Sequence, residues 1–148
     1  MQDVINELLK ETSYLDPYLR QFLRLLDGKN ILLISQNKEY INTKIKDMGY
    51  IVDNLAVINN EENKLYDGII LFNTLNEVDK STIPELLENT FKSLKDHGYI
   101  LIILQNNKNS NNYTKEFLDV FMEANYIFTE ELNNYDNLKF YIYEKKHY

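Results

Sequence analysis

The sequence predicts an α/β fold, in which a mostly parallel sheet is covered by helices on both faces and includes one antiparallel hairpin. Short apolar runs alternate with stretches whose apolar residues recur at helical spacing, and this alternation is typical of parallel sheets. Two further apolar segments, at 126–132 and 138–144, are separated only by NNYDN. Because a segment this short cannot form a crossover helix, the two strands are predicted to pair as a hairpin.

The other elements follow from the same patterns. Strands are predicted at 30–35, 50–58, 66–72 and 99–104, and helices at 2–13, 17–27, 38–48, 82–95 and 113–125. Asp16 is expected to cap the second helix, with Pro17 at its first position and Gly28 as its left-handed end. Gly49 is expected to close the third helix, and Gly98 to lead into the last parallel strand.

No linker or repeat divides the chain, so residues 1–148 are expected to form one domain. A helical segment, 1–28, precedes an α/β core at 29–148.

Composition excludes several classes of function. The chain has no cysteine, which rules out disulfides, thiolate zinc sites and cysteine nucleophiles. Its net charge is −7 and it has no basic stripe, so no nucleic-acid partner is expected. No apolar run is long enough to span a membrane and the first residues do not resemble a secretory signal, so a cytoplasmic location is expected. His97 and His147 lack ligand partners at useful spacing, so no metal is expected.

Four segments together resemble one known family. They are ILLIS (31–35), YDGIILFNTLNEV (66–78), LKDHGYILIIL (94–104) and the hairpin. The order resembles the Rossmann-like class I methyltransferases that use S-adenosylmethionine. In that family the first segment leads into a glycine-rich loop, and the hairpin supplies a reversed last strand. The resemblance implies a three-layer methyltransferase-like fold.

The resemblance also implies where the cofactor site would be. The spacing from Ser35 to Gly49 equals the family's usual spacing between its first loop glycine and the glycine after the first helix, so no gap is needed. Ser35, Asn37 and Glu39 then occupy the three glycine positions, and Ala56 occupies the position of the acid that binds the ribose. Side chains at glycine positions fill cofactor space, and alanine cannot accept hydrogen bonds from hydroxyls. No cofactor is therefore expected, and S-adenosylmethionine would be the cofactor of a functional site.

One βα unit of the family is missing. Only about ten residues separate Ala56 from Tyr66, too few for the third strand and its helices. The resemblance then implies six strands in the order 2-1-4-5-7-6 in the family's numbering. The second strand becomes an edge, which needs cover or a partner.

Several residues have two interpretations. Residues 35–38 (Ser35, Gln36, Asn37 and Lys38) have two readings. They form a residual polar pocket, with Lys38 favouring an anion, or Asn37 or Ser35 only caps the helix. Asn73 and Glu77 follow the third strand; Glu77 stands where many family members carry histidine, and it is either a substrate-facing carboxylate or a solvated loop residue.

Two further features are assigned structural roles. Asp67 resembles a frequent acid of the family that is largely structural, and it is interpreted in the same way here. Phe140, Tyr141 and Tyr143 alternate at strand spacing; packing on both sheet faces is predicted, and a contact surface is the alternative.

Three functions remain open. The leading hypothesis is a non-catalytic methyltransferase-like domain that acts through protein contacts, as a scaffold, partner subunit or self-associating module. Its expected contact surfaces are residues 2–13, 17–27 and the edge at 50–58. The alternatives are an active S-adenosylmethionine-dependent methyltransferase acting on a small molecule, and a binding module for another small anionic ligand.

Overall fold

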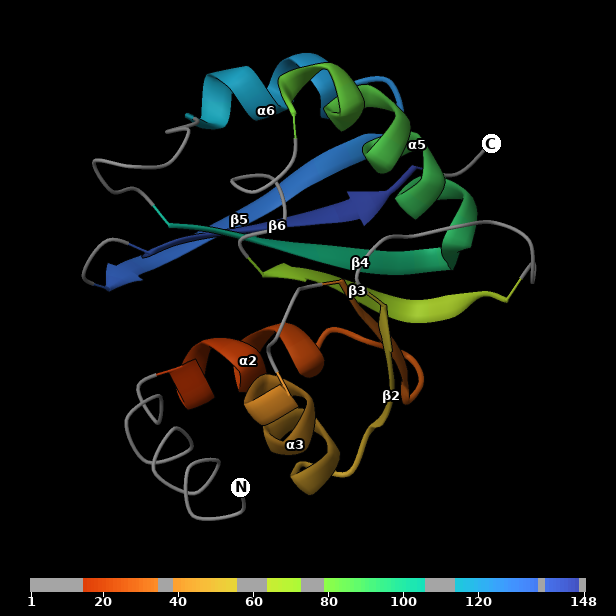
Figure 1. Ribbon diagram of the computed structural model, residues 1–148, viewed down its shortest axis with the longest axis vertical. Helices are drawn as coiled ribbons and strands as arrows, with labels where there is room; N and C mark the ends of the chain where they lie inside the picture. Colours follow the sequence, from red (N-terminus) through yellow and green to blue (C-terminus); the bar gives the residue numbers. More distant parts are fainter. Residues whose placement is uncertain are drawn as a thin grey trace.

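The computed structural model describes residues 15–34, 39–55, 64–72, 79–105, 114–135 and 138–146. Within these residues, a six-stranded sheet lies between two layers of helices, with α5 and α6 on one face and α2 and α3 on the other (Figure 1). The helical elements are α2 (Asp16–Leu23), α3 (Glu39–Asp47), η2 (Lys80–Thr82), α5 (Ile83–Ser93) and α6 (Lys115–Met122). The strands are β1 (Asn30–Ile34), β2 (Ile51–Leu55), β3 (Tyr66–Phe72), β4 (Leu94–Gln105), β5 (Tyr126–Tyr135) and β6 (Leu138–Lys145).

The strand order is β2-β1-β3-β4-β6-β5. The first four strands in this order are parallel, whereas β6 pairs antiparallel with both β4 and β5. This arrangement confirms the predicted fold class, hairpin and strand order. Within the described ranges no strand lies beyond β2, so β2 is a sheet edge as expected.

The core consists of two apolar layers, one on each face of the sheet. All seven residues of β3 are buried, as expected for a parallel strand covered on both faces. In β6, Phe140 packs in the layer with α2 and α3, whereas Tyr141 and Tyr143 pack in the layer with α5 and α6. The aromatic residues of β6 therefore fill both layers, as the packing interpretation predicted.

Helix α2 differs from the prediction at both ends. Its N-cap is Leu15, and no side chain caps it. The prediction that Asp16 caps the helix is therefore wrong; its carboxylate instead accepts a hydrogen bond from Lys44 Nζ at 2.8 Å. The helix ends at Leu23 rather than at Gly28. Gly28 is needed for another reason, because a Cβ atom there would collide with the carboxylate of Asp67.

Two turns involve left-handed backbone. Gly49 has φ +97° just after α3, as predicted for a glycine that ends a helix. The turn expected at Gly98 lies within a longer strand, because β4 already begins at Leu94. Its register with β3 shifts between Leu94 and Tyr99, and His97 in this interval has φ +67°. The hairpin turn is also shorter than predicted, because Tyr135 still pairs with Leu138.

Asp67 joins the starts of three strands. Its carboxylate is buried, accepts the backbone N–H of Asn30 at 3.0 Å, and lies 3.4 Å from Lys95 Nζ. This geometry agrees with the structural role expected from the sequence.

Replacing Asp67 with alanine is expected to lower the free energy of unfolding by about 1–3 kcal/mol, because a part-buried N–H loses its acceptor. Asp67→Asn keeps an acceptor oxygen and is the matched control, with a smaller expected loss. Urea unfolding measures both variants. Equal losses would show that the hydrogen bond to Asn30 contributes little.

Candidate functional site

The carboxyl ends of the parallel strands form a shared edge. Ile34, at the end of β1, pairs with Leu55 on one side and with Leu71 on the other. Phe72, at the end of β3, pairs with Ile103 of β4. Ligands of open α/β sheets bind beyond this edge, near the point where the strand order reverses. The edge is therefore the candidate site that the resemblance indicated.

The predicted site residues continue from these strand ends. Ser35 follows Ile34 in the sequence, and Ala56 follows Leu55. The residues predicted for this site that lie outside the described part of the chain are Ser35, Asn37, Lys38, Ala56, Asn73 and Glu77. Glu39 is the first residue of α3, and only its backbone is described. The structure thus establishes the strand framework beneath the site.

The floor of this edge is apolar. Ile34, Phe72 and Leu104 are at most 5 % exposed, and they belong to the two core layers. These side chains supply no polar atoms for ligand binding to the described part of the edge.

Asp53 is the described acid of β2, and its carboxylate is already engaged. Lys64 Nζ donates to Oδ2 at 2.5 Å, and the Tyr66 hydroxyl donates to the same atom at 2.8 Å. The hydrogen bond from Lys64, followed by that from Tyr66, holds the pKa of Asp53 below its usual value. Asp53 is therefore an ion-paired acid of β2 whose carboxylate is already held by two donors.

A second polar cluster lies between α6 and the hairpin. Asp119 accepts hydrogen bonds from Lys115 Nζ at 2.7 Å and from the Tyr143 hydroxyl at 3.0 Å. Lys115 Nζ also stands 4.1 Å from the centre of the Phe128 ring. Burial, followed by the hydrogen bond to Asp119, raises the pKa of Tyr143. Because its partners come from α6 and the hairpin, this cluster fastens the helix to the sheet.

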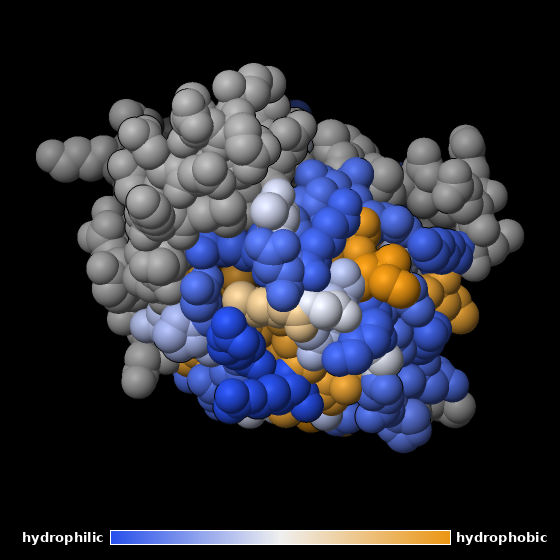
Figure 2. Space-filling view, turned by 90° about the horizontal axis from the view of Figure 1, so that it is seen from below, coloured by the Kyte–Doolittle hydropathy of each residue, from blue (hydrophilic) through white to orange (hydrophobic). Residues whose placement is uncertain are grey.

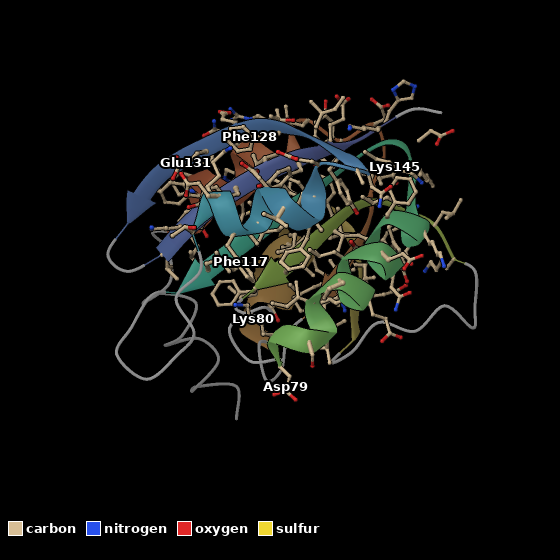
Figure 3. The ribbon with its side chains drawn as sticks, turned by 90° about the horizontal axis from the view of Figure 1, so that it is seen from above. Asp79, Lys80, Phe117, Phe128, Glu131 and Lys145 are labelled. Atoms are coloured by element: carbon tan, nitrogen blue, oxygen red, sulfur yellow. The ribbon has the colours of Figure 1, made fainter. Side chains whose placement is uncertain are left out.

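Two lysines on the same side of the molecule cover aromatic rings. Lys80 Nζ lies 5.1 Å from the centre of the Phe117 ring, and Figure 3 shows the two side chains beside each other. Lys145 donates to the carbonyl of Leu94 at 2.6 Å and lies over the Phe91 ring. Burial lowers the pKa of Lys145. The two lysines therefore cover aromatic rings that pack in the layer with α5 and α6.

Sequence patterns alone did not identify these clusters. Asp53 and Tyr66 lie on strands that flank β1, so their contact depends on the strand order. The strand order inferred from the resemblance was the available signal for this contact.

The described residues contain no group of three or more histidines, cysteines or acids close enough to hold a metal ion. None of the described helices has the length and apolar character needed to cross a membrane. His97 is exposed in its turn, as expected.

Known protein families and curated proteins give no match to the sequence. Solved structures do match: the PH0226 protein from Pyrococcus horikoshii OT3 superposes with a TM-score of 0.75 at 11% identity, covering 93% of this chain and 90% of that one. The glycopeptide N-methyltransferase MtfA, complexed with S-adenosylhomocysteine, gives a TM-score of 0.71 at 8% identity, covering 91% and 90% of the two chains. The chain has a class I methyltransferase-like fold.

A third similar structure contains S-adenosylmethionine itself. Magnesium protoporphyrin IX methyltransferase from Synechocystis PCC 6803, with bound S-adenosylmethionine, gives a TM-score of 0.67 at 6% identity. The match covers 98% of this chain and 79% of the methyltransferase. The methyltransferase-like architecture is thus shared across almost the whole chain, although the sequences have diverged widely.

Proposed function

We propose that this protein is a non-catalytic methyltransferase-like domain that acts through protein contacts. The observation that carries the proposal is the register of β1 and β2, in which Ile34 pairs with Leu55. The next residues in the sequence are Ser35 and Ala56. This register supports the assignment of Ser35 to the first glycine position of the family and of Ala56 to the position of the ribose-binding acid.

The described residues near these strands do not compensate for the loss. Asp53 is the nearest described acid of β2 in the sequence, and its carboxylate is held by Lys64 and Tyr66. Using it for a ribose would require breaking an ion pair and a hydrogen bond. This cost opposes conventional binding of S-adenosylmethionine.

The two edge strands supply surfaces for protein contacts. β2 and β5 lie at opposite ends of the sheet, and among the described strands each has a neighbour on one side only. Ile51 of β2 is 60% exposed, and Ile127 of β5 is 49% exposed. Exposed edge strands with apolar side chains favour pairing with another chain. A partner subunit or a second copy is therefore the proposed occupant of one edge.

Calorimetric titration with S-adenosylmethionine and S-adenosylhomocysteine tests the catalytic half of the proposal. We expect no binding of either molecule in the micromolar range. Low-micromolar binding of either molecule would contradict the non-catalytic assignment. It would favour the second candidate, an active methyltransferase acting on a small molecule. The similarity to cofactor-bound methyltransferases supports that candidate.

Light scattering and partner capture test the contact half. We expect either self-association or recovery of a defined partner, and the variants Ile51→Lys and Ile127→Lys then show which edge is used. Val120→Lys is the matched control, because Val120 is 74% exposed on α6 rather than on an edge strand. A strict monomer that captures no partner would contradict this half of the proposal.

A further inference from the structure

The two arginines of the chain line a pair of adjoining hollows beside α2. The smaller hollow has a volume of about 120 Å³ and is lined by Arg20, Leu23, Arg24, Met48 and Tyr50. The larger has a volume of about 360 Å³ and shares both arginines. Figure 2 views the side of the molecule that carries α2 and α3, where hydrophilic atoms border a strip of apolar ones.

The hollows lie away from the candidate cofactor edge. Met48 follows α3, and Tyr50 immediately precedes β2, so the smaller hollow stands at the amino ends of the strands. Its wall is fixed in place, because the Tyr50 hydroxyl donates to the carbonyl of Leu23 at 3.2 Å. The hollow is therefore separate from the candidate cofactor site at the carboxyl edge.

The charges in this region favour an anion. Within the described residues, neither arginine side chain has an ion-pair or hydrogen-bond partner. Lys29 adds a third positive charge, with its Nζ 4.3 Å from the centre of the Tyr50 ring. The lining of the smaller hollow contains no carboxylate. Asp16, which lines the larger hollow, is neutralised by Lys44 at 2.8 Å.

The geometry also limits the kind of anion. Residues four apart on a helix lie side by side, so the two guanidinium groups can bind one group from the same direction. Planar guanidinium groups match phosphate oxygens in pairs, and phosphate carries enough charge for two of them. Leu23, Met48 and Tyr50 supply an apolar wall for a small organic substituent. The smaller hollow lies below the roughly 300–1,000 Å³ of pockets for larger ligands.

We propose that this hollow is a binding site for a small phosphate monoester. The phosphate group is held between Arg20 and Arg24, and the organic group lies against Tyr50. The positive charge of Lys29 strengthens the site. In a chain whose net charge is −7, this local concentration of positive charge is what attracts the anion.

Titration followed by nuclear magnetic resonance tests the site directly, with phenyl phosphate and inorganic phosphate as probes. Because the chain has only two arginines, its Nε–H spectrum contains two signals, and single variants assign them. We expect both signals to shift with saturation on adding phenyl phosphate, and less strongly with inorganic phosphate. Acetate at the same ionic strength is expected to leave them nearly unchanged. Equal shifts with acetate, or no shift with phenyl phosphate, would overturn the proposal.

Charge-matched variants complete the test. Arg20→Gln and Arg24→Gln are each expected to weaken phenyl phosphate binding about tenfold, which is the effect of losing one charged hydrogen bond. Both side chains are exposed, so the variants should fold normally. Lys92→Gln removes the same charge from α5, on the other face of the sheet, and is expected to change binding less than about twofold. An equal loss of phenyl phosphate binding in Lys92→Gln would mean that net charge alone causes the effect, and it would contradict the proposed site.

Discussion

Truncation of Phe140 to alanine is expected to lower the free energy of unfolding by about 3–5 kcal/mol. Phe140 is fully buried in the middle of β6 and stacks on Tyr18, with the ring centres 4.3 Å apart. The stack joins the start of α2 to the hairpin, so truncation opens a cavity between elements that cannot easily close together. Urea unfolding of the purified variant measures the loss.

Val120→Ala is the control for this experiment. Val120 is 74% exposed on α6, so its truncation is expected to change the free energy of unfolding by less than about 0.5 kcal/mol. A loss below about 1 kcal/mol for Phe140→Ala would mean that the surrounding layer collapses around the missing ring. The contact between α2 and the hairpin would then be adaptable rather than tightly packed.

The folded protein is expected to lose stability steeply as the pH rises above 10. Tyr126, Tyr141 and Tyr143 are each at most 3% exposed. Burial raises the pKa of Tyr141 to about 12, and it also raises the pKa values of Tyr126 and Tyr143 above the ordinary value of 10.0. The unfolded chain releases these protons near pH 10, whereas the folded chain keeps them.

The direction of this effect follows from proton binding. Where the folded state holds more protons, the free energy of unfolding falls as the pH rises, by about 1.4 kcal/mol per pH unit for each retained proton. The tyrosine contribution is complete below pH 10 and is lost as the pH rises through the folded pKa values. For Tyr141 this window ends near pH 12. Urea unfolding at a series of alkaline pH values measures the slope.

Tyr126→Phe separates this effect from the titration of lysines. The variant keeps the ring. Thr90, whose hydroxyl lies 2.9 Å from that of Tyr126, still has the carbonyl of Leu87 as its acceptor at 2.7 Å. Above pH 10, we expect the free energy of unfolding to fall less steeply with pH in this variant. The difference should be about 1.4 kcal/mol per pH unit, the value for one retained proton, while the lysine contribution stays the same. An unchanged slope would show that the Tyr126 hydroxyl titrates alike in the folded and unfolded chains.

The sequence predicted the central strands better than the helix ends. β3 was predicted at its observed bounds, because a fully buried strand requires a continuous apolar run. The end of α2 was placed at Gly28 rather than at Leu23, because the glycine resembled a helix terminator. Its actual role depends on Asp67, thirty-nine positions away in the sequence, and no local pattern contains that information.

Of the candidate site, the sequence predicted only the strands that lead to it. The resemblance assigned Ser35 to the first glycine position and Ala56 to the end of the second strand. Both residues lie outside the described part of the chain, and the pairing of Ile34 with Leu55 describes only the strands that lead to them. The hollow at Arg20 and Arg24 could not be predicted in the same way. Arginines on one helix face usually indicate only a solvated surface, and the opposite wall comes from the turn before β2.

The position of β6 between β4 and β5 has a consequence for synthesis on the ribosome. Among the strands that the structure describes, β5 pairs with β6 alone, and β6 is made after it. Until residues 138–145 emerge, β4 presents an unpaired side and β5 has no place in the sheet. During this interval the nascent chain can accept β6 from a neighbouring copy, which would exchange strands between the two molecules. Slower translation of this segment should therefore increase strand-swapped dimers and the need for chaperones.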